Sequence, residues 1–178
     1  MFENLNLTPI SLRILLFLAR SPDKEFYERE LASLTKTSTG GAHYAVKTLK
    51  AMGLITEEPS GKNIYYTINT KNASIPCFKI FMTLQELHPL VRRLEPLTQK
   101  IIVFGSCATG QDTMESDIDL FILTTEKASV LKVLGKSIGG RPLQPVVLSA
   151  VELLNMKENN EALHQEITRG ITVWDDNP

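Results

Sequence analysis

Residues 100–123 read KIIVFGSCATGQDTMESDIDLFIL. The apolar run at residues 100–104 predicts a short strand, and Gly105 and Ser106 follow it directly as a small-residue turn. A second strand is predicted from Asp117 to residue 123. Because side chains alternate along a strand, Asp117 and Asp119 should lie on one face, with the aliphatic residues next to them on the other.

This spacing suits the binding of a phosphorylated ligand together with a metal. Carboxylates two residues apart on a strand can share hard cations such as Mg²⁺ or Mn²⁺, so Asp117 and Asp119 are the predicted metal ligands and catalytic residues. At Gly105 the backbone can approach a ligand closely. The Ser106 hydroxyl and the N–H groups of a predicted helix start at residues 106–110 can hold phosphates. Gly105 and Ser106 are therefore the predicted nucleotide-binding residues.

The same segment resembles the minimal members of the DNA polymerase β-type nucleotidyltransferase superfamily. Their signature is Gly-Ser, ten residues and Asp-x-Asp, which this sequence matches at Gly105, Ser106, Asp117 and Asp119. The flanking pattern also fits, with Phe104, Ala108, Gly110, Ser116 and Leu120. The resemblance covers about residues 100–174, and it implies a nucleoside triphosphate as ligand, Mg²⁺ or Mn²⁺ as cofactor, and a small α/β domain.

One feature departs from that family. A third carboxylate is expected on a later strand, here residues 142–149, which contain no Asp or Glu. Gln144 lies near the expected position, and an amide can bind a cation but cannot neutralise it or accept a proton. General-base assistance contributes about 10²–10⁴-fold to a rate, so an intact catalytic mechanism is in doubt. Glu152, on the following helix, is an alternative source of the carboxylate.

The first seventy residues have a different pattern. Apolar residues recur at helical spacing in residues 10–18, 28–34 and 38–52, and Gly53 follows the third helix as a C-terminal glycine. Residues 54–58 and 63–68 alternate as strands around a turn at 59–62, which predicts a hairpin. The order resembles a winged helix-turn-helix domain of the bacterial and archaeal regulator type, from about Leu5 to Thr70.

In that fold the third helix enters the major groove of DNA. Its segment from Ser38 to Met52 contains no Arg, Asn or Gln. These are the usual base-reading residues, so we expect phosphate contacts with modest base readout. A winged helix that serves dimerisation or protein contact is the alternative. The predicted DNA-binding residues are Ser38, Thr39, His43, Tyr44, Lys47 and Lys50 on the helix, and Lys62 and Asn63 on the hairpin.

Together these patterns predict an α+β chain, with a winged helix-turn-helix domain (residues 1–72), a connecting helix (73–98) and a nucleotidyltransferase domain with a mixed sheet (99–178). The connecting segment is one helix or two joined near Pro89, and it links the domains or forms a homodimer seam. Within the last domain we expect helices at 127–138 and 150–169 and a strand at 171–174. Arg141 follows a Gly-Gly turn and is expected to be a solvated turn residue.

Charge and composition limit the remaining possibilities. Residues 1–75 contain nine Lys or Arg against seven Asp or Glu, a balance of +2, whereas residues 101–178 contain six against eleven, a balance of −5. A mildly basic first part permits DNA binding. The two cysteines, Cys77 and Cys107, lack metal-site spacing and predict neither a disulfide nor a zinc site. No signal peptide or membrane span is evident, so we expect a soluble, cytoplasmic protein.

Three functions fit this organisation. The first is a DNA-binding enzyme that transfers a nucleotidyl group to a hydroxyl or protein side chain. The second is a transcriptional regulator whose nucleotidyltransferase domain is catalytically degenerate and binds a nucleotide or a partner. The third is an antitoxin-like protein that works with a second chain. The missing third carboxylate favours the binding of nucleotide and metal over turnover.

Overall fold

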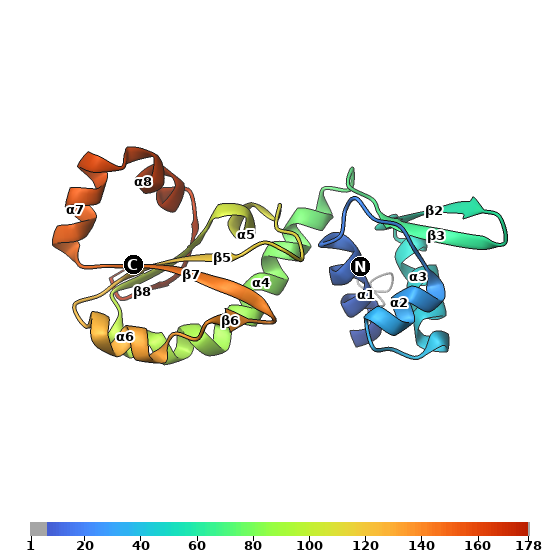
Figure 1. Ribbon diagram of the computed structural model, residues 1–178, viewed down its shortest axis with the longest axis horizontal. Coiled ribbons are helices and arrows are strands. Elements are labelled where there is room, and N and C mark those ends of the chain that lie inside the picture. The colour runs from blue at the N-terminus through green and yellow to red at the C-terminus, as the bar shows by residue number, and fades with distance from the viewer. Residues whose placement is uncertain (1–6, 178) are drawn as a thin grey trace. The chain divides into compact units, whose positions relative to one another are not determined.

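The computed structural model describes residues 7–177, and the chain folds as two compact units, Met1–Lys79 and Ile80–Pro178 (Figure 1). The outer ends of the predicted domains, at residues 1 and 178, and the start of the winged-helix resemblance at Leu5 lie outside the described residues. The inner boundaries predicted after residues 72 and 98 stay a prediction. Each unit is described separately below.

The first unit contains three helices and a three-stranded antiparallel sheet of order β1-β3-β2, which confirms the predicted winged helix. Its elements are α1 (Pro9–Ala19), β1 (Phe26–Tyr27), α2 (Glu28–Leu34), α3 (Thr39–Ala51), β2 (Ile55–Ser60) and β3 (Asn63–Ile68). The side chain of Thr8 caps α1 and that of Ser38 caps α3. Each accepts a backbone N–H in the first turn, as capping residues do.

Gly41 explains why α1 and α3 pack so closely. A Cβ atom at this position would lie 2.7 Å from Cδ1 of Ile10, which is shorter than any real carbon contact. Ile14, Leu18 and Leu49 are fully buried in the core that these two helices share. The glycine is poorly suited to a helix interior, but here its missing side chain lets a neighbouring helix approach.

The second unit is built on a five-stranded mixed sheet of order β6-β7-β5-β4-β8, in which β5 and β7 are parallel and the other pairs antiparallel. Its elements are η1 (Glu95–Leu97), β4 (Lys100–Phe104), α5 (Gly105–Thr109), β5 (Ile118–Leu123), α6 (Lys127–Val133), β6 (Ser137–Ile138), β7 (Arg141–Leu148), α7 (Ala150–Asn159), α8 (Glu161–Thr168) and β8 (Ile171–Asp175). The predicted α+β class with a mixed sheet is confirmed. The helix α4 (Ser74–Leu94) continues through Pro89 as one helix and contributes residues to both units.

The two faces of this sheet carry different helices (Figure 1). Alternate β5 residues Ile118 and Leu120 pack with the second half of α4 and with Val130 of α6. Phe121, on the other face, packs with Ile167 of α8 and with α7. The sheet is therefore covered on both sides, and α7 and α8 lie over the face on which the odd-numbered residues of β5 point. No helix formed between residues 7 and 177 has the combined length and apolarity that crossing a lipid bilayer requires.

Two predicted helices were too long. The helix expected at 127–138 ends at Val133, and Gly139 and Gly140 form a positive-φ turn that joins β6 to β7. Such turns are typical of hairpins, and glycine adopts their positive φ angles without strain. The helix expected at 150–169 is two helices separated at Asn160. The Asn160 side chain accepts the N–H of Leu163 at 3.2 Å, so it starts α8 as an N-cap.

The prediction that Arg141 is a solvated turn residue was wrong. Its side chain is 3% exposed, and the guanidinium forms ion pairs with Asp112 and Glu86, each at 2.9 Å. It also donates to Thr83 Oγ1 and approaches Cys107 Sγ, both at 3.3 Å. A single buried cation thus ties β7 to α4, to α5 and to the loop before β5.

We expect Arg141→Met to destabilise the second unit by about 3–5 kcal/mol, because removing one member of a buried ion pair leaves its partners without their counter-charge. Trp174 is the only tryptophan in the chain and lies on β8, so its fluorescence during urea unfolding reports this unit. Arg92→Met is the control, since Arg92 is exposed and its ion pair is with Glu95, three residues along the chain. An exposed pair of this kind should contribute less than about 1 kcal/mol. A similarly small loss for Arg141→Met would contradict the assigned role.

Candidate functional site

The Gly-Ser turn and the Asp-x-Asp segment meet because β4 pairs with β5. Phe104, the last residue of β4, is the antiparallel partner of Asp119. Gly105 comes next, with a φ of +66°, and a Cβ atom there would collide with Oδ2 of Asp119. Both the backbone angle and the lack of space therefore require glycine. The predicted nucleotide-binding turn lies directly against one of the predicted metal ligands.

Gln144 occupies the neighbouring strand beside the carboxylates. In the parallel pairing of β5 with β7 it is the partner of Asp119, and its Nε2 donates to Oδ2 of Asp117 at 3.3 Å. This places an amide where a third carboxylate would face the other two. The site therefore carries one negative charge fewer than three carboxylates would supply.

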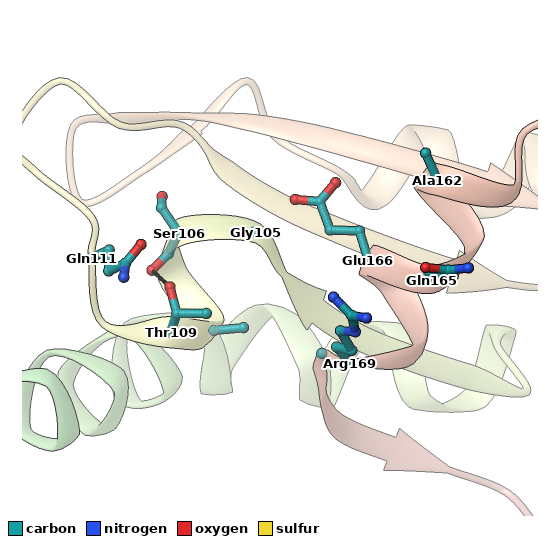
Figure 2. Close-up of a pocket in the computed structure, with 10 residues that line it drawn as sticks. Gly105, Ser106, Thr109, Gln111, Ala162, Gln165, Glu166 and Arg169 are labelled. Carbon is teal, nitrogen blue, oxygen red and sulfur yellow. Dashed lines mark hydrogen bonds between the residues drawn. The ribbon is translucent and has the colours of Figure 1, made fainter.

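A cavity of about 530 Å³ lies beside the Gly-Ser turn (Figure 2). Gly105, Ser106 and Gln111 line one side, and Glu166 of α8 and Arg169, which caps the end of α8, line the other. Figure 2 shows the Glu166 carboxylate extending from α8 toward α5. We did not predict these two α8 residues as part of the site, because the local pattern indicated only an amphipathic helix. The signal that could have found them is the break at Asn160, which makes α8 a separate element.

Glu152 does not replace the third carboxylate. It begins α7, where its side chain accepts the N–H of Ser149 at 2.8 Å and pairs with Lys127. These interactions lower the pKa of Glu152 to about 2, with the Lys127 contact as the largest cause. Ser149 follows Leu148, which pairs with Leu123 at the opposite end of β5 from Asp119. The start of α7 is therefore at the far edge of the sheet from the two aspartates.

All eight predicted DNA-contacting residues are exposed, and the structure divides them into groups. Thr39 from the start of α3 and Lys62 and Asn63 from the hairpin line one cavity of about 700 Å³. Arg29 of α2 lines the same cavity and is also exposed. It was not predicted because only the third helix and the hairpin were considered. The fold thus adds an arginine, a base-reading residue, to a surface for which none was predicted.

Two of the predicted contacts already have acidic partners. Nδ1 of His43 lies 3.1 Å from Oε2 of Glu28, and Lys50 forms an ion pair with Glu57 of β2. Tyr44 is 73% exposed, and with Lys47 it lines a separate hollow along α3. The hydroxyl of Ser38, the N-cap of α3, accepts the N–H of Gly41 at 3.1 Å. Lys47, Lys62 and Arg29 are therefore better placed than Lys50 for attracting DNA phosphates.

Comparison with known proteins agrees with this division. The profile of the family described as polymerase beta, nucleotidyltransferase matches residues 89–178, and the MarR family profile matches residues 5–63. The chain belongs to the polymerase beta nucleotidyltransferase family. Its N-terminal part is a MarR-like winged helix, so the predicted fusion of the two domains is confirmed.

The other two comparisons add little to this assignment. A crystal structure of a protein from Sulfolobus solfataricus, assigned as a nucleotidyltransferase, aligns with 61% of this chain and 94% of its own, with 15% identity and a TM-score of 0.41. This likeness is too distant to indicate a function. A search of curated proteins finds no match.

Within this nucleotidyltransferase domain, Asp119 is a carboxyl group whose ionised form is disfavoured by its surroundings. Its pKa is raised, first by burial, then by the negative charge of Glu166 and then by that of Asp117. Two neighbouring negative charges therefore act on the Asp119 carboxylate. A bound cation would relieve this repulsion.

The residues present suit a divalent cation. Asp117 and Asp119 offer carboxylate oxygens, the ligands that Mg²⁺ and Mn²⁺ prefer. The Gly105 turn, which has no side chain, lies directly beside them. Among residues 7–177, no three His, Cys, Asp or Glu side chains already form a metal-binding group. This segment thus offers two acidic ligands, and a bound cation would need further ligands from outside it.

We expect Asp119→Asn to stabilise the metal-free protein at pH 7, by less than about 1 kcal/mol because water screens a half-exposed group. The raised pKa means that ionised Asp119 disfavours the folded state. This cost is absent below the ordinary Asp pKa of about 3.9 and develops as the pH rises through the raised value. Unfolding followed by Trp174 fluorescence from about pH 4 to pH 7 should show a widening difference, and a variant less stable than wild type at pH 7 would contradict this.

Proposed function

We propose that this nucleotidyltransferase binds a nucleoside triphosphate together with Mg²⁺ or Mn²⁺, and binds DNA through its winged helix. The observation that carries the first part is that Gly105, which lines the cavity between α5 and α8, lies directly against Asp119. A phosphate chain that enters beside Gly105 would meet Ser106 on one side and the carboxylates on the other. The volume of this cavity falls within the range usual for small-ligand sites.

Each residue has a distinct part in this proposal. Gly105 lets the phosphate approach the backbone, and the Ser106 hydroxyl can donate to a phosphate oxygen. Asp117 and Asp119 would hold the divalent cation, which when bound supplies neutralisation of the phosphate charge. Arg169 brings a positive charge to the opposite wall of the cavity. These residues bind and orient the triphosphate whether or not transfer follows.

Transfer of a nucleotidyl group requires more than binding. The attacking hydroxyl must lose its proton, and Gln144, opposite Asp119, cannot accept it. This observation favours a second candidate function, a regulator whose nucleotidyltransferase domain senses nucleotide without turning it over. The two candidates share the same ligand site and differ only in what happens after binding.

DNA binding is proposed for the surface formed by the hairpin and the exposed side of α3. Lys47 and Lys62 are exposed there, Arg29 of α2 is exposed beside Lys62, and the fold is one that places its third helix in the major groove. Because Lys50 is paired with Glu57, its contribution to phosphate attraction is reduced. We therefore expect binding that depends more on phosphate contacts than on base contacts.

We expect calorimetry with each of the four nucleoside triphosphates and Mn²⁺ to detect binding by the wild-type chain. The double variant Asp117→Asn/Asp119→Asn should lose at least about tenfold in affinity, since even the outer partners of metal ligands contribute about that much. Glu158→Gln is the control, because Glu158 is exposed on α7 outside the cavity. If the double variant binds the nucleoside triphosphate as tightly as the wild-type chain, Asp117 and Asp119 do not form the binding site.

The same samples distinguish the two candidates for the nucleotidyltransferase domain. Incubation with α-phosphate-labelled nucleotides and candidate protein or nucleic-acid acceptors should label an acceptor only if the enzyme function is correct. Nucleotide binding without any labelling would support the regulator. Labelling that disappears in the double variant would support the enzyme.

For DNA, we expect Lys47→Ala and Lys62→Ala to weaken binding similarly for all sequences, because each lysine is proposed to contact phosphate. The logarithm of the binding constant falls as the logarithm of the salt concentration rises, and each variant should reduce the steepness of this fall by about 1. Fluorescence anisotropy with duplexes of different sequence and salt concentration measures both effects. Lys24→Ala, an exposed lysine in the loop after α1, should leave affinity and slope unchanged. No detectable binding by the wild-type chain at low salt would refute the DNA-binding proposal.

A further inference from the structure

The acidic pair and helix α8 share one face of the sheet. Along β5, Ile118 and Leu120 point into the core beneath α4. Because side chains alternate, Asp119 points with Phe121 to the opposite face. Phe121 packs against Ile167 of α8. Residues of α8 next to Ile167 are therefore above the same face that presents Asp119 and Gln144.

Gly170 fixes the end of α8 on the sheet. A Cβ atom there would lie 2.5 Å from the Val103 carbonyl oxygen and 2.6 Å from Cγ2 of Ile102. The chain leaving α8 is thus in direct contact with β4, one residue before Phe104, which pairs with Asp119. This close packing sets the position from which Glu166, four residues earlier, faces the cavity.

The lining of the cavity agrees with this placement. Glu166 and Gly105 line the same cavity, and a Cβ atom at Gly105 would collide with Oδ2 of Asp119, so Gly105 lies between the cavity and this carboxylate. Glu166 is itself exposed and lines the cavity with Gly105 and Ser106. Its carboxylate can therefore move toward Asp119 when an attractive charge is present.

Two other positions that could supply a third carboxylate do not do so. The β7 position facing Asp119 holds Gln144, and Glu152 is committed to the cap of α7 and to Lys127. We propose that Glu166 of α8 supplies the third carboxylate of the divalent-cation site of Asp117 and Asp119. The β7 position facing Asp119 cannot supply it, because it holds the neutral amide of Gln144. This proposal rests on the proposed function, since it requires that Asp117 and Asp119 bind a cation.

A glutamate on a helix suits this role for a physical reason. Cations of this class accept carboxylate oxygens from different elements, and a third negative charge would balance a divalent ion and part of a second. A glutamate side chain has one methylene group more than an aspartate, which lengthens its reach from α8 toward β5. Ion binding would then also join α8 to β5, which are connected in the free protein through apolar packing.

The test is Mn²⁺ binding to the full chain, measured by the loss of the free-ion electron paramagnetic resonance signal, without any assay of activity. Glu166→Gln should weaken Mn²⁺ binding at least about tenfold. Glu158→Gln, which removes the same charge from exposed α7, should leave it unchanged. The double variant Glu166→Gln/Gln144→Glu should recover binding, because it moves the third carboxylate to the β7 position.

The outcomes separate this proposal from the proposed function. If the wild-type chain binds Mn²⁺ and Glu166→Gln binds it equally well, the assignment of Glu166 is overturned and the Asp117–Asp119 site stands. If the wild-type chain binds no Mn²⁺ with or without nucleoside triphosphate, both are overturned. Recovery by the double variant supports a direct role for the carboxylate, since a loss of folding would not be rescued by Gln144→Glu.

Discussion

The nucleotidyltransferase site depends on the ion pairs that the buried Arg141 guanidinium forms with Asp112 and Glu86. It joins Asp112, in the loop between the Gly-Ser turn and β5, to Glu86 of α4. That loop has to bring the chain back to β5, where Asp119 lies against Gly105, without a helix or strand of its own. A buried ion pair is costly to desolvate and does not by itself make a protein more stable, but it permits few alternative arrangements. The loop is therefore held by charge, while the sheet beneath it is held by apolar packing.

The local parts of this structure could be predicted from the sequence, and its long-range contacts could not. The strands around Gly105 and Asp119 follow from alternation and from the small-residue turn. Arg141 was misjudged because its partners are 29 and 55 residues away in the chain, and a Gly-Gly turn ordinarily places its next residue in solvent. Glu166 was missed for a similar reason, since only the fold shows that α8 covers the face of the sheet bearing the carboxylates.

In the first unit the same limit applies to charge. The exposed lysines of α3 are visible in the sequence, but the pairing of Lys50 with Glu57 and of His43 with Glu28 depends on how the hairpin and α2 pack. The acidic partners reduce the positive potential that the sequence indicates, while Arg29 adds to it from another helix. A count of basic residues along one helix therefore describes this surface poorly.

The strand β8 has a consequence for how the chain is made. β4 lies between β5 and β8 in the sheet, yet β4 ends at Phe104 and β8 begins only at Ile171. At about 5–20 residues per second, a ribosome needs roughly 3–13 seconds to synthesise that interval. Throughout this time β4 exposes an open edge of N–H and C=O groups, which favours association with other chains. The strands of the winged helix are all complete much earlier, so a growing chain can hold a finished first unit while the second still needs protection.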